Sequence, residues 1–234
     1  MTLIDTAEMY AEGRAEQLLG EALDGLRDQV FLVSKVFPYH GSRDGVRRAC
    51  EDSLRRLRTD HLDLYLLHWP GTEPLSETLA GFEDLLTAGK IRHWGVSNFD
   101  PELMQKLFAL PGGDHCATNQ ILYNLTRRGP EFDLLPWMES RSLPFMAYSP
   151  LEQGRLPIQG ALAEIAARHG KSPWQVALAW VLRRPDAMAI PKTSSPEHLR
   201  QNLAALELQL SPGELAALDA QFPPPSKKRS LETL

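Results

Sequence analysis

The feature that most constrains the fold is the alternation of short apolar runs with longer segments of helical spacing. Most of the apolar runs are unbroken, which is typical of parallel strands covered on both faces. Serine before proline predicts a capped helix start at Ser172, and Gly89 predicts a helix end. The candidate strands are seven, TLID (2–5), VFLVSK (30–35), LDLYLLH (62–68), IRHWGVS (91–97), CATNQI (116–121), PFMAYSP (144–150) and AMAIPK (187–192), and helices are predicted at 14–26, 43–57, 75–89, 172–184 and 196–208.

Strands that alternate with helices at this spacing predict a parallel α/β architecture, either an open doubly wound sheet or a closed barrel. No G-x-G-x-x-G fingerprint follows the first strand, as an open dinucleotide-binding sheet would require. Polar residues that end nearly every strand indicate the top face of a (β/α)8 TIM barrel. We therefore predict a single barrel domain over residues 1–234, with Asp5, Lys35, His68, Ser97, Asn98, Gln120, Tyr148, Ser149, Lys192 and Thr193 at its mouth.

A barrel of this kind needs eight strands, and the sequence offers seven. We expect the missing strand to precede Met1, which would then be an internal methionine of a longer reading frame. A barrel lacking one strand exposes two sheet edges, so we expect a monomer or a weak homodimer. The proline run FPPP near residue 222 predicts that the tail is extended.

Composition and charge exclude several classes of protein. A net charge of −5 gives no basic patch for nucleic acid or for an anionic membrane, and KKR at 227–229 is interpreted as solvated tail. Cys50 and Cys116 have no companions at metal-ligand spacing, so neither a disulfide framework nor a metal site is predicted. Asp5 and Glu8 stand where a signal peptide would be basic, and no apolar run reaches membrane-spanning length. These features predict a cytoplasmic protein.

Four residues near the first three strand ends form a candidate catalytic group: Asp5, Tyr10, Lys35 and His68. Taken singly, they have structural interpretations as a helix cap, a rim residue, a solvent-reaching lysine and a hydrogen-bonded core histidine. Together they would bring an acid, a base and an imidazole into one partly buried space. A nearby ammonium favours the ionised form of a phenol, so Tyr10 becomes a candidate general acid and His68 a donor to a carbonyl oxygen.

An ordered series of motifs supports this interpretation: DTAEMYAEGRAEQLLGEAL, VFLVSK, LDLYLLHWP, GKIRHWGVSNF, NQILYN, AYSPL and IPKTSSPEHLRQN. In that order they resemble the motifs of the aldo-keto reductase superfamily, of bacterial type, over essentially the whole chain. The resemblance implies NADPH-dependent reduction of small aldehydes and ketones such as methylglyoxal. By resemblance Tyr10 would be the proton donor, Lys35 and Asp5 would adjust its acidity, and His68 would orient the carbonyl.

The same resemblance assigns cofactor contacts. Many relatives carry arginine where this chain has His198, and a neutral imidazole lacks the guanidinium fork. NADPH is therefore predicted with a weaker preference over NADH. An alternative interpretation is that the SNF motif only caps a helix starting near Pro101. The matched positions are Ser97, Asn98 and Gln120 for the carboxamide, Tyr148 for the nicotinamide ring, Ser149, Pro150 and Leu151 for the pyrophosphate, Lys192, Thr193 and His198 for the 2′-phosphate, and Asn202 for adenine.

Substrate contacts are predicted at His68, Trp69, Phe37 and Tyr39, which would form an aromatic pocket mouth for small aldehydes, ketoaldehydes or diketo-sugars.

Two other functions stay open. One is a catalytically weak or inactive NADPH-binding regulatory module, which the expected loss of a strand favours. The other is an aldolase that uses Lys35 as a Schiff-base nucleophile, which would require a lysine without an acid partner.

Overall fold

The computed structural model describes residues 2–234, and the chain consists of two compact units, the first ending at Asn119. The described residues contain seven strands, as the sequence predicts. The expectation that Met1 is an internal methionine lies outside the described residues. None of the helices within residues 2–234 combines the length and apolar character needed to cross a membrane.

The first unit is built on a parallel sheet of four strands in chain order, and β3 is buried at every position. The register pairs Asp5 with Val33, and Lys35 with Leu66. Parallel pairing places the carboxyl ends of these strands at one edge of the sheet. The strands are β1 (Leu3–Asp5), β2 (Phe31–Val36), β3 (Leu62–Leu67) and β4 (Ile91–Ser97).

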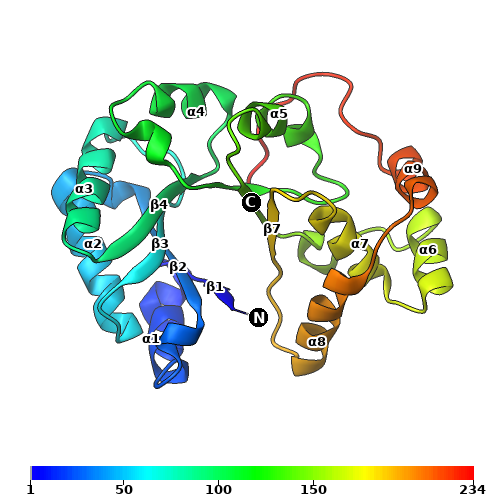
Figure 1. Cartoon of the computed structure of the whole chain (residues 1–234), viewed down its shortest axis with the longest axis horizontal. Coiled ribbons are helices and arrows are strands. Elements are labelled where there is room, and N and C mark those ends of the chain that lie inside the picture. The colour runs from blue at the N-terminus through cyan, green and yellow to red at the C-terminus, as the bar shows by residue number, and fades with distance from the viewer. Residues whose placement is uncertain (1) are drawn as a thin grey trace. The chain divides into compact units, whose positions relative to one another are not determined.

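Four α-helices follow these strands, and α2 and α3 lie side by side on one face of the sheet (Figure 1). Ser42 caps α2 by accepting a hydrogen bond from the Gly45 amide. Gly89, at φ +68°, ends α3 in the left-handed conformation that suits glycine, as predicted. The aromatic core beneath them stacks Phe82 on Trp94 at 5.4 Å. The helices are α1 (Arg14–Ala22), α2 (Arg43–Leu57), α3 (Leu75–Thr87) and α4 (Pro101–Phe108).

The second unit contains two paired parallel strands, β6 and β7, in which Tyr148 lies opposite Ile190. Ser172 caps the start of α7 before Pro173, as predicted, and Gln175 completes a capping box with it. Helix α7 is buried nearly all round, which its apolar sequence requires. The elements are β5 (Asn119–Leu122), which begins at the last residue of the first unit, α5 (Leu134–Glu139), β6 (Phe145–Tyr148), α6 (Ala161–His169), α7 (Pro173–Leu182), β7 (Ala187–Ile190), α8 (Pro196–Ala204) and α9 (Pro212–Gln221).

The five predicted helices are present, α2 with the predicted bounds and the other four with shorter ones, and α4 begins at Pro101 as expected. Helices α5, α6 and α9 were not predicted. The strand predicted at 116–121 begins later, at Asn119, because Gly113–His115 forms a short 3-10 helix that Cys116 ends. No helix or strand follows Gln221 in the described residues, in line with the prediction of an extended tail.

A buried carboxylate joins the first helix of the chain to the sheet. Glu16 on α1 accepts a hydrogen bond of 2.5 Å from the Ser34 hydroxyl and one of 2.7 Å from Arg56 Nε, and its side chain has no exposed surface. Removing one member of a buried ion pair costs about 3–5 kcal/mol because the other charge loses its compensation. We therefore expect Glu16→Ala to lower the free energy of unfolding in urea by about that amount.

The matched control is Glu21→Ala, on the same helix. Glu21 pairs with Arg58 at 3.1 Å, but its side chain is 60% exposed. Exposed pairs contribute about 0–1 kcal/mol, so this variant should unfold at nearly the wild-type urea concentration. Equal losses in the two variants would contradict the stabilising role given to Glu16.

Candidate functional site

The centre of the first unit's site is the ammonium of Lys35, whose side chain has no exposed surface. Its Nζ lies 2.5 Å from Asp5 Oδ2, 2.8 Å from the Thr6 carbonyl oxygen and 3.2 Å from the Tyr10 hydroxyl. These contacts use the three donors of the ammonium. The interpretation of Lys35 as a solvent-reaching side chain is wrong.

Tyr10 reaches this ammonium because the chain after β1 turns sharply. The Glu8 amide donates to the Lys35 carbonyl oxygen, which keeps the segment beside β2. Beyond Tyr10, Ala11 and Glu12 have φ of 50° and 57°, a left-handed conformation that residues other than glycine adopt at a cost. The Tyr10 ring lies with its centroid 4.8 Å from Lys35 Nζ, and the residue is 38% exposed. A phenol held against a buried cation yet open to a ligand is suited to proton transfer.

His68 follows β3 and lies edge-on to Tyr10, with 5.6 Å between the ring centroids. It is only 8% exposed, and its Nδ1 atom has no hydrogen-bond partner. The interpretation of a fully hydrogen-bonded core histidine is therefore wrong. Burial, with a smaller contribution from the Lys35 charge, lowers the pKa of His68 from 6.5 to about 3. The ring is neutral near pH 7 and has one N–H to donate.

This depressed pKa makes His68 a source of acid sensitivity. Below about pH 6.5 the unfolded chain binds a proton at this residue that the folded chain does not bind until about pH 3, so stability falls as the pH falls through that interval. At about pH 4 the loss amounts to about 3 kcal/mol. We expect His68→Gln to remove this contribution. Urea unfolding of the wild type and of His68→Gln at pH 7 and pH 4 measures this contribution. An equal decrease in the free energy of unfolding in the two proteins between these pH values would contradict the expectation.

Ser97 ends β4, and Asn98 follows with φ 60°. The side-chain nitrogen of Asn98, Nδ2, lies 3.3 Å from the His68 carbonyl oxygen and 3.2 Å from Ser97 Oγ. Ser97 and Asn98 are therefore fixed beside the His68 main chain. The cap of α4 is Asp100, whose carboxylate accepts from the Leu103 amide at 2.8 Å. The alternative that the SNF motif merely caps this helix is therefore wrong.

Aromatic side chains adjoin His68 in the first unit. Trp69 packs against His68 at 4.9 Å between centroids, and Phe37 packs edge-on against Trp69 at 5.1 Å. Tyr39 lies 5.1 Å from Phe37 and is 78% exposed. The three aromatic residues predicted to contact substrate thus form one continuous wall beside His68.

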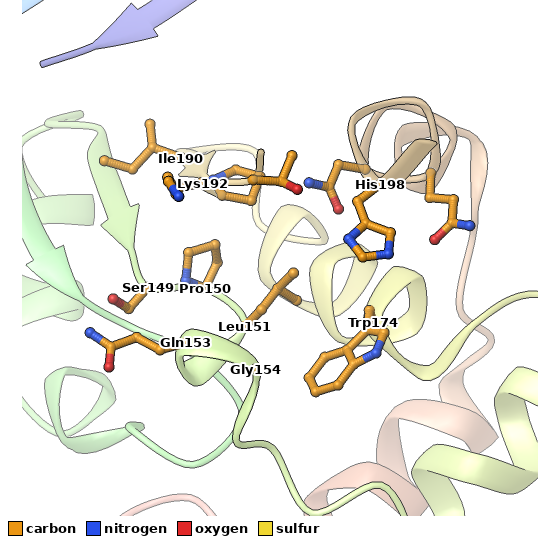
Figure 2. Close-up of a pocket in the computed structure, with 13 residues that line it drawn as sticks. Ser149, Pro150, Leu151, Gln153, Gly154, Trp174, Ile190, Lys192 and His198 are labelled. Carbon is orange, nitrogen blue, oxygen red and sulfur yellow. The ribbon is translucent and has the colours of Figure 1, made fainter. Parts of the chain in front are cut away.

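The second unit contains a cavity of about 590 Å³. Figure 2 shows Pro150 and Leu151 on one side, facing Lys192 and His198. Two predicted cofactor residues of this unit, Gln120 and Tyr148, do not line it. Gln120 is buried, with its amide nitrogen 3.8 Å from Met146 Sδ. The predicted residues that line the cavity are Ser149, Pro150, Leu151, Lys192, Thr193, His198 and Asn202, and the lining residues that were not predicted are Gln153, Gly154, Trp174, Ile190, Pro191 and Gln201.

One wall of this cavity follows β6, where Ser149, Glu152 and Gln153 all have positive φ. Asn124 holds this turn by donating to the Ser149 carbonyl oxygen at 2.9 Å and to the Glu152 carboxylate at 2.8 Å. Arg127 adds an ion pair with Glu152 at 2.9 Å. The unusual backbone is therefore fixed by side chains from outside the turn.

The other wall joins the end of β7 to α8. Thr193 Oγ1 accepts a hydrogen bond from the Ser195 amide, and Ser195 caps α8 by accepting from the His198 amide. An ammonium, a hydroxyl and an imidazole beside a helix N-terminus form a donor set that suits a phosphate ester, so these residues fit the nucleotide end of a phosphorylated cofactor. Among residues 2–234, no three His, Cys, Asp or Glu side chains are grouped so that they would hold a metal ion.

Trp174 is the largest lining residue that was not predicted. It directly follows the capped start of α7, where packing periodicity gives no reason for a large aromatic side chain. Trp174 is half-buried in the structure, and no sequence pattern distinguishes it from a core tryptophan.

The chain matches the model of the aldo/keto reductase family over residues 1–221, and it belongs to this family. It is 55% identical to methylglyoxal reductase YeaE of Escherichia coli, over 99% of this chain and 84% of that protein. It is 32% identical to methylglyoxal reductase DkgB of Salmonella typhi, over 92% of this chain and 82% of that protein.

Solved structures agree with this assignment. An aldo-keto reductase from Klebsiella pneumoniae in complex with NADPH superimposes with a TM-score of 0.98 at 54% identity, over 100% of this chain and 84% of that one. The thermostable aldo-keto reductase Tm1743 superimposes with a TM-score of 0.87 at 42% identity, over 93% of this chain and 81% of that one. The predicted fold class, an α/β barrel of parallel strands, is confirmed by this likeness.

Proposed function

We propose that the chain reduces small aldehydes and ketones, methylglyoxal among them, to alcohols with NADPH, and that Tyr10 donates the proton to the carbonyl oxygen. The observation that carries the proposal is the 3.2 Å contact between the Tyr10 hydroxyl and a fully buried ammonium that is paired with Asp5. The relatives named as methylglyoxal reductases and the NADPH complex of the Klebsiella protein support it.

The cofactor contacts expected from the sequence are part of this proposal. Lys192, Thr193 and His198 would bind the 2′-phosphate, because they supply the donors of the cavity wall beside α8. NADPH, when bound, supplies the hydride that the carbonyl carbon receives. The other proposed contacts are Ser149, Pro150 and Leu151 with the pyrophosphate, Asn202 with adenine, Ser97, Asn98 and Gln120 with the carboxamide, and Tyr148 with the nicotinamide ring.

In the proton-transfer step, the Tyr10 hydroxyl donates to the carbonyl oxygen as that oxygen gains negative charge. The phenolate that remains is stabilised by the Lys35 ammonium, and Asp5 together with the Thr6 carbonyl holds that ammonium in position. The same ion pair argues against a Schiff-base aldolase, since an ammonium bound to a carboxylate is not a free amine nucleophile.

His68 is proposed to orient the substrate. A neutral imidazole donates one hydrogen bond, and the carbonyl oxygen would accept it beside the Tyr10 hydroxyl. Because its pKa lies far below neutrality, His68 is not the source of the transferred proton at pH 7. Phe37, Tyr39 and Trp69 would enclose the carbon end of the substrate, which favours small ketoaldehydes and diketo-sugars.

We also propose that the protein works in the cytoplasm. Both cysteines, Cys50 and Cys116, are free and buried. Burial raises the pKa of each thiol to about 12, so neither is poised to react as a thiolate. Unlinked cysteines are the usual state in a reducing compartment.

The proposal is tested by following NADPH absorbance after methylglyoxal is added to the purified protein. We expect consumption that depends on both protein and methylglyoxal, and slower consumption with NADH. Tight NADPH binding without turnover of any small carbonyl compound would instead support the regulatory-module interpretation. Failure to bind NADPH would refute both.

A further inference from the structure

Glu8 lies between Asp5 and Tyr10 in sequence, and its carboxylate takes no part in the proton transfer described above. Its side chain is 10% exposed. One oxygen, Oε1, accepts a hydrogen bond of 2.5 Å from the Phe37 amide and lies 3.1 Å from His40 Nδ1. A carboxylate that is nearly buried and accepts two donors on one oxygen has a fixed position.

Both donors belong to one short turn, Phe37–Gly41, which follows β2. Within it the His40 amide donates to the Phe37 carbonyl oxygen at 2.8 Å. At its far end the Gly41 carbonyl oxygen accepts a hydrogen bond of 2.6 Å from Thr78. Glu8 therefore holds the start and the middle of the turn, and Thr78 holds its end.

This turn carries part of the aromatic wall beside His68. The Phe37 ring packs against both Trp69 and Tyr39, and it lies edge-on to the His40 ring with 6.2 Å between the centroids. The Glu8 amide is itself bound to the Lys35 carbonyl oxygen at 3.3 Å. The carboxylate thus connects the segment that carries Tyr10 to the segment that carries Phe37.

We propose that Glu8 is a positioning residue that sets the aromatic wall at its working distance from Tyr10 and His68 and thereby determines affinity for the carbonyl substrate. The inference rests on the proposed function, because it assigns Phe37, Tyr39 and Trp69 to the substrate. Tyr10 keeps its place without this carboxylate, since the main chain of its segment is bound to β2. Loss of the carboxylate should therefore raise KM and spare kcat.

The test compares Glu8→Ala, Glu8→Gln and a matched control, Glu12→Ala. Glu12 belongs to the same segment, but its side chain is 90% exposed and pairs only loosely, at 3.5 Å, with Arg14. Steady-state kinetics with methylglyoxal and with 4-nitrobenzaldehyde give KM and kcat, and fluorescence titration gives the Kd for NADPH. Hydrogen exchange of the Phe37 amide, followed by NMR, reports on the contact itself and needs no turnover.

For Glu8→Ala we expect KM to rise about tenfold, the scale of one charge-assisted hydrogen bond, with kcat and the NADPH Kd within about threefold of wild type. Glu8→Gln keeps an oxygen that can accept from the Phe37 amide, so its KM should rise less. The Phe37 amide should exchange faster in the alanine variant than in the glutamine variant or the control.

Two results would overturn the inference. One is a KM in Glu8→Ala no higher than in Glu12→Ala, and the other is a joint loss of kcat and NADPH affinity, which would mean that Glu8 supports the fold in general. If wild-type protein reduces no carbonyl compound, the proposed function fails. Unchanged exchange of the Phe37 amide in Glu8→Ala would then refute the positioning role as well, and faster exchange would support it.

Discussion

Tyr10→Phe should abolish carbonyl reduction and leave NADPH binding intact. The substitution removes only the hydroxyl that lies 3.2 Å from Lys35 Nζ, and it keeps the ring that packs near the ammonium and His68. General acid catalysis contributes about 10²–10⁴ in rate, so kcat with methylglyoxal should fall by that factor. The Kd for NADPH, measured by fluorescence titration, should stay within about twofold of wild type because Tyr10 is assigned to the proton and not to the cofactor.

A matched control is Tyr65→Phe. Tyr65 is fully buried in β3 and packs against Phe82, with 6.0 Å between centroids. Loss of its hydroxyl removes no group from the site, so kcat should be unchanged. A Tyr10→Phe enzyme as active as Tyr65→Phe would show that another group supplies the proton.

Lys35→Met should lose both activity and stability. The substitution keeps much of the side-chain volume but removes the charge that compensates Asp5 at 2.5 Å and that would stabilise the Tyr10 phenolate. We expect kcat to fall by more than about 10². The free energy of unfolding should fall by about 3–5 kcal/mol, because the nearly buried Asp5 carboxylate loses its charged partner.

The double variant Lys35→Met with Asp5→Asn separates these two effects. Replacing the carboxylate by a neutral amide removes the electrostatic cost, so urea unfolding should recover a large part of the lost stability. Activity should not recover, because the cation beside Tyr10 is still absent. Recovery of turnover in the double variant would contradict the role assigned to Lys35.

The proximity of the strand-end residues could be predicted from the sequence, for a geometric reason. Asp5, Lys35 and His68 lie at or next to the carboxyl ends of three consecutive parallel strands, and parallel pairing places such ends at one edge of the sheet. The approach of Tyr10 was predicted, but its cause was not. It depends on the turn that the Tyr10 amide closes by donating to the Ala7 carbonyl oxygen, and on the hydrogen bond from the Glu8 amide to the distant Lys35 carbonyl oxygen, which no local pattern indicates.

Features that depend on contacts between distant segments were missed. The positioning contacts of Glu8 join residues about thirty positions apart, and no local pattern indicates them. Gln153 and Gly154 line the second unit's cavity through a turn that Asn124 stabilises from outside. Helix α9 is a different case, since Ser211 and Glu214 form a capping box, a pattern that is local in the sequence.

The most direct test of the central claim is the stoichiometry of the reaction. Purified protein is incubated with a limiting amount of NADPH and excess methylglyoxal, and both NADP⁺ and the alcohol product are quantified by NMR. The proposed function predicts one molecule of hydroxy-carbonyl product for each NADPH oxidised by wild-type protein, and almost none of either with Tyr10→Phe over the same time. Oxidation of NADPH without alcohol formation, or equal alcohol formation by Tyr10→Phe, would contradict it.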